Sequence, residues 1–302
     1  MAGSRPAPEQ LLLRLEWTVV RRLDGLYQGD HRTLFRGHGV DLLDIREYQP
    51  GDDVRYIDWN VTARLDEPYV RQYLEDRDLT AWFLLDLSPS VDFGTVETRK
   101  RDQLVGFVGV VARLLTRHGN RVGAIFYGDH VEPPIPATAG RRQVLRLLHE
   151  LDRHEPLKIA PFTALGDLLA AAGRQLVRRS LVFVVSDFIS APGWEAPLAL
   201  LARRHDVVVV RLTDPREIEL PDLGALTLTD AETGEQLWID THDAAFRSRF
   251  AGAMREREQT LAAAFRHAGV AVLPLSTEDD LVSAIVRFVI ARRQRKALGR
   301  VG

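Results

Sequence analysis

The feature that most constrains this chain is a regular alternation of apolar runs and amphipathic segments, which begins near residue 79 and continues to residue 293. Short apolar runs predict strands of a sheet that is buried on both faces; they cover residues 79–85, 121–127, 181–185, 207–212 and 270–275. Segments with apolar residues three and four positions apart predict helices; they cover residues 97–118, 140–153, 164–176, 194–205, 243–268 and 278–293. Strands that alternate with helices predict a doubly wound, mostly parallel α/β sheet with helices on both faces.

One late segment departs from this alternation. Two runs of alternating polarity flank Glu232-Thr233-Gly234-Glu235 and predict a β-hairpin over residues 226–240.

The first 78 residues follow a different pattern. Apolar spacing predicts an amphipathic helix over residues 8–27, and short β-branched and aromatic stretches at 40–48, 54–59 and 69–73 predict a small β-rich annex in which Trp59 packs inward. We divide the chain into an N-terminal helix (1–30), the annex (31–77), the α/β domain (78–295) and a basic tail (296–302).

Composition excludes several classes of site and partner. The formal net charge of −2 gives no general attraction to nucleic acid, and the absence of cysteine excludes disulfides, thiolate metal sites and cysteine nucleophiles. No stretch approaches the roughly 20 apolar residues of a membrane-spanning helix, so we expect no stable membrane insertion and a cytoplasmic location. Lysine occurs only at Lys100, Lys158 and Lys296, and we attribute the excess of arginine to a GC-rich genome.

Polar side chains follow two of the predicted strands and open one predicted helix. Asp86, Ser88 and Ser90 come after the strand at 79–85, and alternation in an extended loop can aim all three at one point. Asp187 follows the strand at 181–185, and Thr163 precedes the helix at 164–176. Carboxylate and hydroxyl oxygens at the carboxyl edge of a parallel sheet suit a hard cation. Each also has a simpler explanation, in turn formation for the loop and Asp187 and in helix capping for Thr163.

The order of these motifs is similar to that of a known site. DLSPS, FTALGDLL and VSDF together resemble the metal-ion-dependent adhesion site of von Willebrand factor A domains. The resemblance implies that Ser88, Ser90 and Thr163 supply oxygens to one Mg²⁺ or Mn²⁺, and that Asp86 and Asp187 act directly or through water. A partner's carboxylate would complete the shell. With only two nearby carboxylates the bound cation keeps positive character, which favours a client protein with an acidic residue.

Two longer phrases resemble one bacterial subgroup, domain-of-unknown-function family 58 (DUF58), which has a von Willebrand factor A-like fold. They are GHGVDLLDIREYQPGDDVRYIDWNVTAR at residues 37–64 and TDPREIELPDLGALTLTDAETGEQLWIDT at residues 213–241. This resemblance implies a partnership with a MoxR-type AAA+ ATPase in chaperone-like complex assembly or regulation. Many relatives carry N-terminal transmembrane helices, and this chain departs from that form.

The hypothesis is therefore a metal-dependent protein-interaction module that is not an enzyme. The chain contains no Gly-x-Ser-x-Gly elbow, no phosphate-binding Walker A loop and no HExxH pattern. One alternative is a metal-dependent phosphoester hydrolase with Asp86 as nucleophile or as ligand for a phosphate substrate. Position 88 is serine, however, where a nucleophilic aspartate needs an acid–base carboxylate two residues on. The other is a scaffold whose loop holds no metal.

Overall fold

The computed structural model describes residues 44–49, 57, 59–65, 67–72, 79–95, 98–157, 163–230 and 232–298. These residues fall into two compact units, one within residues 36–79 and one within residues 80–302. The predicted helix at 8–27 lies outside the described residues. Within these ranges, no helix is both long and apolar enough to cross a lipid bilayer.

The smaller unit contains two antiparallel strands, β1 (Asp44–Glu47) and β2 (Tyr69–Gln72), and the helix α2 (Trp59–Leu65). Both strands lie within predicted ones. The side chain of Trp59 is 69% exposed, so the expectation that it packs inward is wrong. The described part of this unit, two strands and one short helix, encloses too little volume to bury an indole ring.

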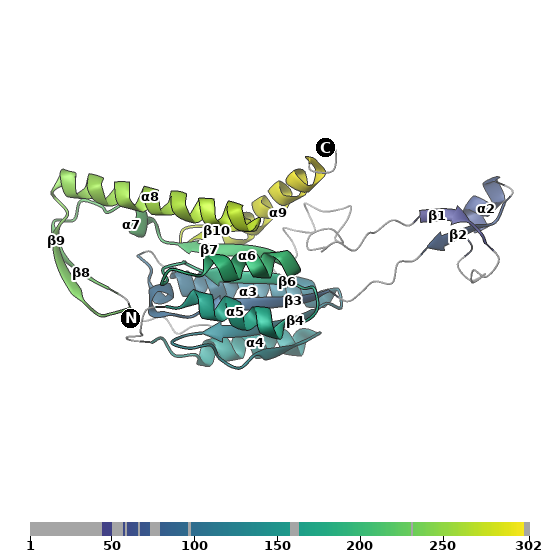
Figure 1. The fold of residues 1–302 in the computed structure, drawn as a ribbon, viewed down its shortest axis with the longest axis horizontal. Coiled ribbons are helices and arrows are strands. Elements are labelled where there is room, and N and C mark those ends of the chain that lie inside the picture. Colours follow the sequence, from purple (N-terminus) through teal and green to yellow (C-terminus); the bar gives the residue numbers. More distant parts are fainter. Residues whose placement is uncertain are drawn as a thin grey trace. The chain divides into compact units, whose positions relative to one another are not determined.

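The larger unit is built on a six-stranded sheet with the order β10-β7-β6-β3-β4-β5 (Figure 1). Its strands are β3 (Thr80–Asp86), β4 (Arg121–Tyr127), β5 (Ile135–Thr138), β6 (Leu181–Ser186), β7 (Asp206–Thr213) and β10 (Ala271–Ser276). Five strands are parallel, and only β5 pairs with its neighbour β4 in the antiparallel sense. The predicted doubly wound, mostly parallel α/β sheet is confirmed.

Helices cover both faces of this sheet. They are α3 (Lys100–Arg117), α4 (Arg141–Arg153), α5 (Leu165–Gln175), α6 (Glu195–Arg204), α7 (Pro215–Ile218), α8 (Ala244–Ala268) and α9 (Leu281–Leu298). The helices α5, α6 and α8 pack on one face, and α3 and α4 pack on the other (Figure 1). Helix α9 continues past the predicted end at residue 293 and ends at Leu298.

The predicted hairpin is also present in this unit. Strands β8 (Ala225–Thr229) and β9 (Gln236–Asp240) pair with each other and with no strand of the main sheet. The hairpin connects α7 to the start of α8 (Figure 1).

Aromatic clusters fix the central strands from both sides. On one face Phe83 of β3 and Phe183 of β6 stack with ring centroids 5.3 Å apart, and Phe107 of α3 meets Phe183 edge-on at 5.5 Å. On the other face Phe188, just beyond β6, packs against Phe265 of α8 with centroids 4.9 Å apart. These contacts hold the carboxyl ends of β3 and β6 in place.

The chain changes direction at β3. It continues from β3 to β4 on one side and later returns as β6 on the other side of β3. In open α/β sheets ligands bind at such a switch point, outside the carboxyl ends of the strands. Asp86 ends β3, and Ser186 ends β6 at the same edge.

Candidate functional site

The loop after β3 is a compact turn. Residues Pro89–Asp92 form one turn of 3-10 helix (η3), with Ser88 at its N-cap and Pro89 in the first turn, where proline is favourable. The Ser88 and Ser90 hydroxyl oxygens are therefore 3.2 Å apart. The expectation of an extended loop is wrong, since this helical turn is what brings the hydroxyls together. Arg101 fixes the far end of the turn through Asp92, at 3.2 Å.

Asp86 lies at the bottom of this loop with no exposed surface. Its Oδ1 accepts a hydrogen bond from the Ser88 backbone N–H (3.1 Å), and its Oδ2 accepts one from the Ser186 hydroxyl (2.6 Å). Burial, together with the negative charge of Asp187, raises the pKa of Asp86 to about 7. Among the described residues, no basic side chain pairs with Asp86 to offset the cost of burying its charge.

Thr163 comes to the same edge from the start of α5. It precedes the N-cap residue Ala164, and its buried hydroxyl donates to Glu232 Oε2 at 3.1 Å. The Leu165 N–H is satisfied instead by the Ser190 hydroxyl at 3.0 Å. Helix capping, the simpler explanation for Thr163, is therefore wrong, and its hydroxyl faces another part of the chain.

Asp187 is brought close to Asp86, but its oxygens already have partners. Oδ1 accepts from the Ile189 N–H at 2.9 Å, as in a turn, and Oδ2 contacts Lys100 Nζ at 2.6 Å. Burial opposes ionisation of Asp187, but the Lys100 ammonium outweighs it and lowers the pKa of the carboxyl. The following residue, Phe188, has a φ of 53°, a conformation that costs energy in any residue but glycine and that its aromatic packing maintains.

Lys100 is a functional candidate that the sequence reasoning missed. Its side chain is fully buried at the start of α3, and Nζ lies 2.6 Å from both Asp187 Oδ2 and Glu217 Oε1. In a chain with three lysines and many arginines, a lysine ten residues after the predicted loop was an available signal. Its compact ammonium fits a buried point between two carboxylates better than a guanidinium would.

Glu232 is the second residue that the sequence reasoning missed. It lies in the β8–β9 turn with 4% of its surface exposed, and its Oε1 accepts from the Ser90 N–H at 3.4 Å. With its contact to Thr163, this carboxylate joins two of the predicted ligands. The expectation of only two nearby carboxylates is therefore wrong. No local pattern distinguishes Glu232 from Glu235 in the same turn, and only the fold shows which one points inward.

The donor set has the chemistry of a magnesium or manganese site that relies on hydroxyls. In the described part of the chain no three carboxylate or imidazole side chains gather closely enough to hold a metal on their own. The buried oxygens of Ser88, Ser90 and Thr163, with the carboxylates of Asp86 and Glu232, are hard ligands of the kind that Mg²⁺ and Mn²⁺ prefer. The residues present fit such an ion.

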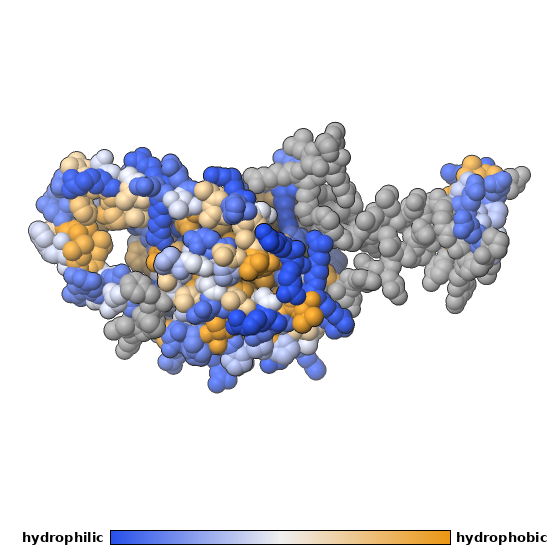
Figure 2. Space-filling model, in the orientation of Figure 1, coloured by the Kyte–Doolittle hydropathy of each residue, from blue (hydrophilic) through white to orange (hydrophobic). Residues whose placement is uncertain are grey.

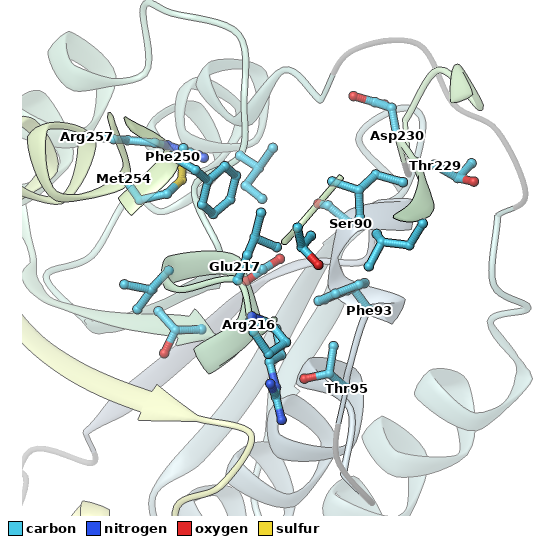
Figure 3. A pocket seen from close by; sticks show the side chains of 18 of the residues that line it. Ser90, Phe93, Thr95, Arg216, Glu217, Thr229, Asp230, Phe250, Met254 and Arg257 are labelled. Atoms are coloured by element: carbon cyan, nitrogen blue, oxygen red, sulfur yellow. The ribbon is translucent and has the colours of Figure 1, made fainter. Parts of the chain in front are cut away.

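A cavity of about 540 Å³ lies beside this edge. Figure 3 shows Ser90 and Phe93 of the loop region on one side of it, and Phe250 and Met254 of α8 on another. The hairpin borders the cavity, and Figure 2 shows the opening between the hairpin and the body of the unit. The candidate site therefore adjoins a largely apolar hollow.

Comparisons with known proteins give the family. An uncharacterized protein of Mycobacterium tuberculosis is 38% identical over 291 residues, which cover 95% of this chain and 90% of that protein. Among solved structures, the conserved hypothetical protein BatB from Bacteroides thetaiotaomicron is 16% identical with a TM-score of 0.45, covering 72% of this chain and 99% of BatB. An aerotolerance-related membrane protein from Bacteroides fragilis has the same identity and TM-score, covering 70% and 96%. The family model described as protein of unknown function DUF58 matches residues 44–260. The chain therefore belongs to the DUF58 family.

Proposed function

We propose that this protein is a protein-interaction module whose site holds one divalent cation, Mg²⁺ or Mn²⁺. Ser88, Ser90 and Thr163 would supply hydroxyl oxygens, and Asp86 and Asp187 would act directly or through water. The cation, when bound, offers a Lewis-acidic position to a carboxylate of the partner. The proposed partner is a MoxR-type AAA+ ATPase, with which the chain acts in complex assembly or regulation on a client with an acidic residue.

One observation carries the metal-binding part of this proposal. Side chains that lie far apart in the sequence meet as buried oxygens at one sheet edge, with the Ser90 loop and Thr163 joined through a single carboxylate. Buried hydroxyls and carboxylates are costly unless they are fully satisfied, and Asp86 has no cationic partner among the described residues. A divalent cation would give these buried oxygens a partner and would supply the positive charge that Asp86 lacks.

The hydrolase alternative gains no support from the geometry. A nucleophilic Asp86 would have to be reached by a phosphoester substrate, but its side chain is fully buried. The neighbouring residue at position 88 is a serine that cannot act as the second carboxylate.

Calorimetric titration with Mn²⁺ and Mg²⁺ tests the cation. We expect one ion per chain, with at least about tenfold weaker binding in Asp86→Ala and in Ser90→Ala, and unchanged binding in Ser248→Ala, a serine on the exposed surface of α8. No binding by the unmodified chain at millimolar concentrations would favour the metal-free scaffold.

Capture of the purified ATPase tests the partner. The assay is run without nucleotide, so that the ATPase has no nucleotide-bound Mg²⁺ of its own to complicate the comparison. Capture should need Mg²⁺ or Mn²⁺ and should be lost on chelation and in Asp86→Ala. Equal capture under all these conditions would contradict a metal-bridged contact.

A further inference from the structure

The Glu232 carboxylate reaches the site from outside the main sheet. It comes from the turn of the β8–β9 hairpin, 142 residues from Ser90 and 69 residues from Thr163. Its two oxygens are divided between these partners, one accepting from the Ser90 N–H and the other from the Thr163 hydroxyl. One acidic side chain of the chain itself therefore bridges two of the proposed ligands.

The turn is built to present this side chain. Asp230 Oδ1 accepts from the backbone N–H groups of Glu232 (2.9 Å) and Thr233 (2.8 Å), which fixes the backbone at the tip. Gly234 closes the turn with a φ of 73°, a conformation that glycine adopts at little cost. Glu235, in the same turn, is exposed. The turn therefore directs one of its two glutamates inward and leaves the other in solvent.

Among the described residues, no cation balances the buried charge of Glu232. Lys100 is committed to Asp187 and Glu217, and no basic side chain in the described ranges pairs with Glu232. A carboxylate removed from water without a counter-charge is unfavourable, so this position suits a residue that meets a positive ion.

We propose that Glu232 is an internal ligand of this site, which completes the cation's oxygen shell until a partner's carboxylate displaces it. This inference rests on the proposed function, because it assumes that the site binds a divalent cation. In this role the hairpin competes with the partner's carboxylate for one position on the cation. Displacement would free the hairpin tip and open the adjacent cavity.

The rest of the hairpin depends on few other buried contacts. Apart from Glu232, the only buried residue in β8, β9 or the described part of their turn is Ile239. Two-stranded hairpins are at best marginally stable in water, so contacts at the tip matter for its order. The cavity of about 540 Å³ on its inner side is lined by Leu226 and Leu228 of the hairpin. Phe250 and Met254 of α8 line it as well (Figure 3). These apolar side chains would become accessible when the tip leaves the site.

Titration with Mn²⁺ alone tests the inference, using Glu232→Gln and the matched control Glu235→Gln. The glutamine keeps the size, its carbonyl oxygen can still accept from the Ser90 N–H, and its amide N–H can donate to the Thr163 hydroxyl oxygen. Circular dichroism verifies that each variant is folded. We expect Glu232→Gln to bind Mn²⁺ at least about tenfold more weakly. Water-proton relaxation should show about one additional exchangeable water on the bound ion, and Glu235→Gln should match the unmodified chain in both measurements.

Hydrogen exchange supplies a second readout. Mn²⁺ should slow the exchange of the β8–β9 amides in the unmodified chain and in Glu235→Gln, but not in Glu232→Gln. Suppose instead that Mn²⁺ binds and Asp86→Ala abolishes binding, while Glu232→Gln leaves affinity, water number and hairpin exchange unchanged. That result would overturn the inference and leave the proposed function intact, whereas no Mn²⁺ binding by the unmodified chain would refute both.

Discussion

Replacement of Lys100 by methionine would leave the Asp187 carboxylate buried without its cation. The Lys100 side chain has no exposed surface, and Nζ lies 2.6 Å from oxygens of Asp187 and Glu217. Methionine fills a similar volume and has no charge, so the change removes the ion pair with little loss of packing. Glu217 is 25% exposed and can turn to solvent, but Asp187 is fully buried and cannot.

The size of the effect follows from this burial. At an effective dielectric constant of 20, two unit charges 2.6 Å apart attract each other by about 6 kcal/mol. The cost of removing both ions from water offsets part of this attraction. Removing one partner of a buried pair typically lowers the free energy of unfolding by about 3–5 kcal/mol. For a unit of this size we expect the thermal midpoint to fall by about 6–20 °C.

Urea and thermal unfolding, followed by circular dichroism, measure this loss. The double variant Lys100→Met/Asp187→Asn separates the orphaned charge from any packing defect, because asparagine can still accept the Ile189 hydrogen bond. We expect the double variant to recover much of the stability that Lys100→Met loses. A loss below about 1 kcal/mol in Lys100→Met, or additive losses in the double variant, would refute the reasoning.

Three further predictions concern parts of the fold that support the site. Phe183→Ala removes a buried ring from the aromatic cluster and should lower the free energy of unfolding in urea by about 3–5 kcal/mol. Gly269→Ala, at the α8 C-cap with a φ of 68°, should cost about 1–2 kcal/mol and lower the thermal midpoint. Burial opposes ionisation of Asp214, but hydrogen bonds from Thr95, Arg216 and Thr277 lower its pKa below the ordinary 3.8. The contribution of the Asp214 carboxylate to the free energy of unfolding is therefore complete above pH 3.8 and is lost as the pH falls through the lowered pKa. The urea midpoints at pH 6 and pH 3 should therefore differ less in Asp214→Asn than in the unmodified chain. Parallel pH profiles of the two proteins would contradict this.

The sheet was predictable because buried parallel strands are marked by continuous apolar runs. The strand predicted at 121–127 is β4 with the same limits, since Gly119-Asn120 precedes the apolar run and a polar turn follows it. The edge strand β5 escaped prediction. Its four residues, Ile-Pro-Ala-Thr, contain a proline and are too few to show a period of two. Edge strands depend on their neighbour for hydrogen bonds more than on their own sequence.

The site was predictable only where sequence position and topology together determine it. Asp86 and Asp187 follow buried strands, and parallel strands carry such residues to one edge. Lys100 and Glu232 could not be placed in this way. Lys100 opens a helix whose first turn points back toward the sheet edge, and Glu232 depends on how far the hairpin folds over that edge. Both are tertiary contacts between segments more than 65 residues apart.

The charges around the site indicate what a partner would have to provide. Asp187 shares Lys100 with the partly exposed Glu217, which leaves Asp86 and Glu232 as two buried negative charges that no basic residue of the described ranges neutralises. One divalent cation balances that pair. If a partner's carboxylate replaces Glu232, the net charge at the cation does not change, so electrostatics alone gives the exchange little driving force. A partner must therefore gain affinity elsewhere, and the apolar cavity that the hairpin borders is the nearest surface on which it could do so.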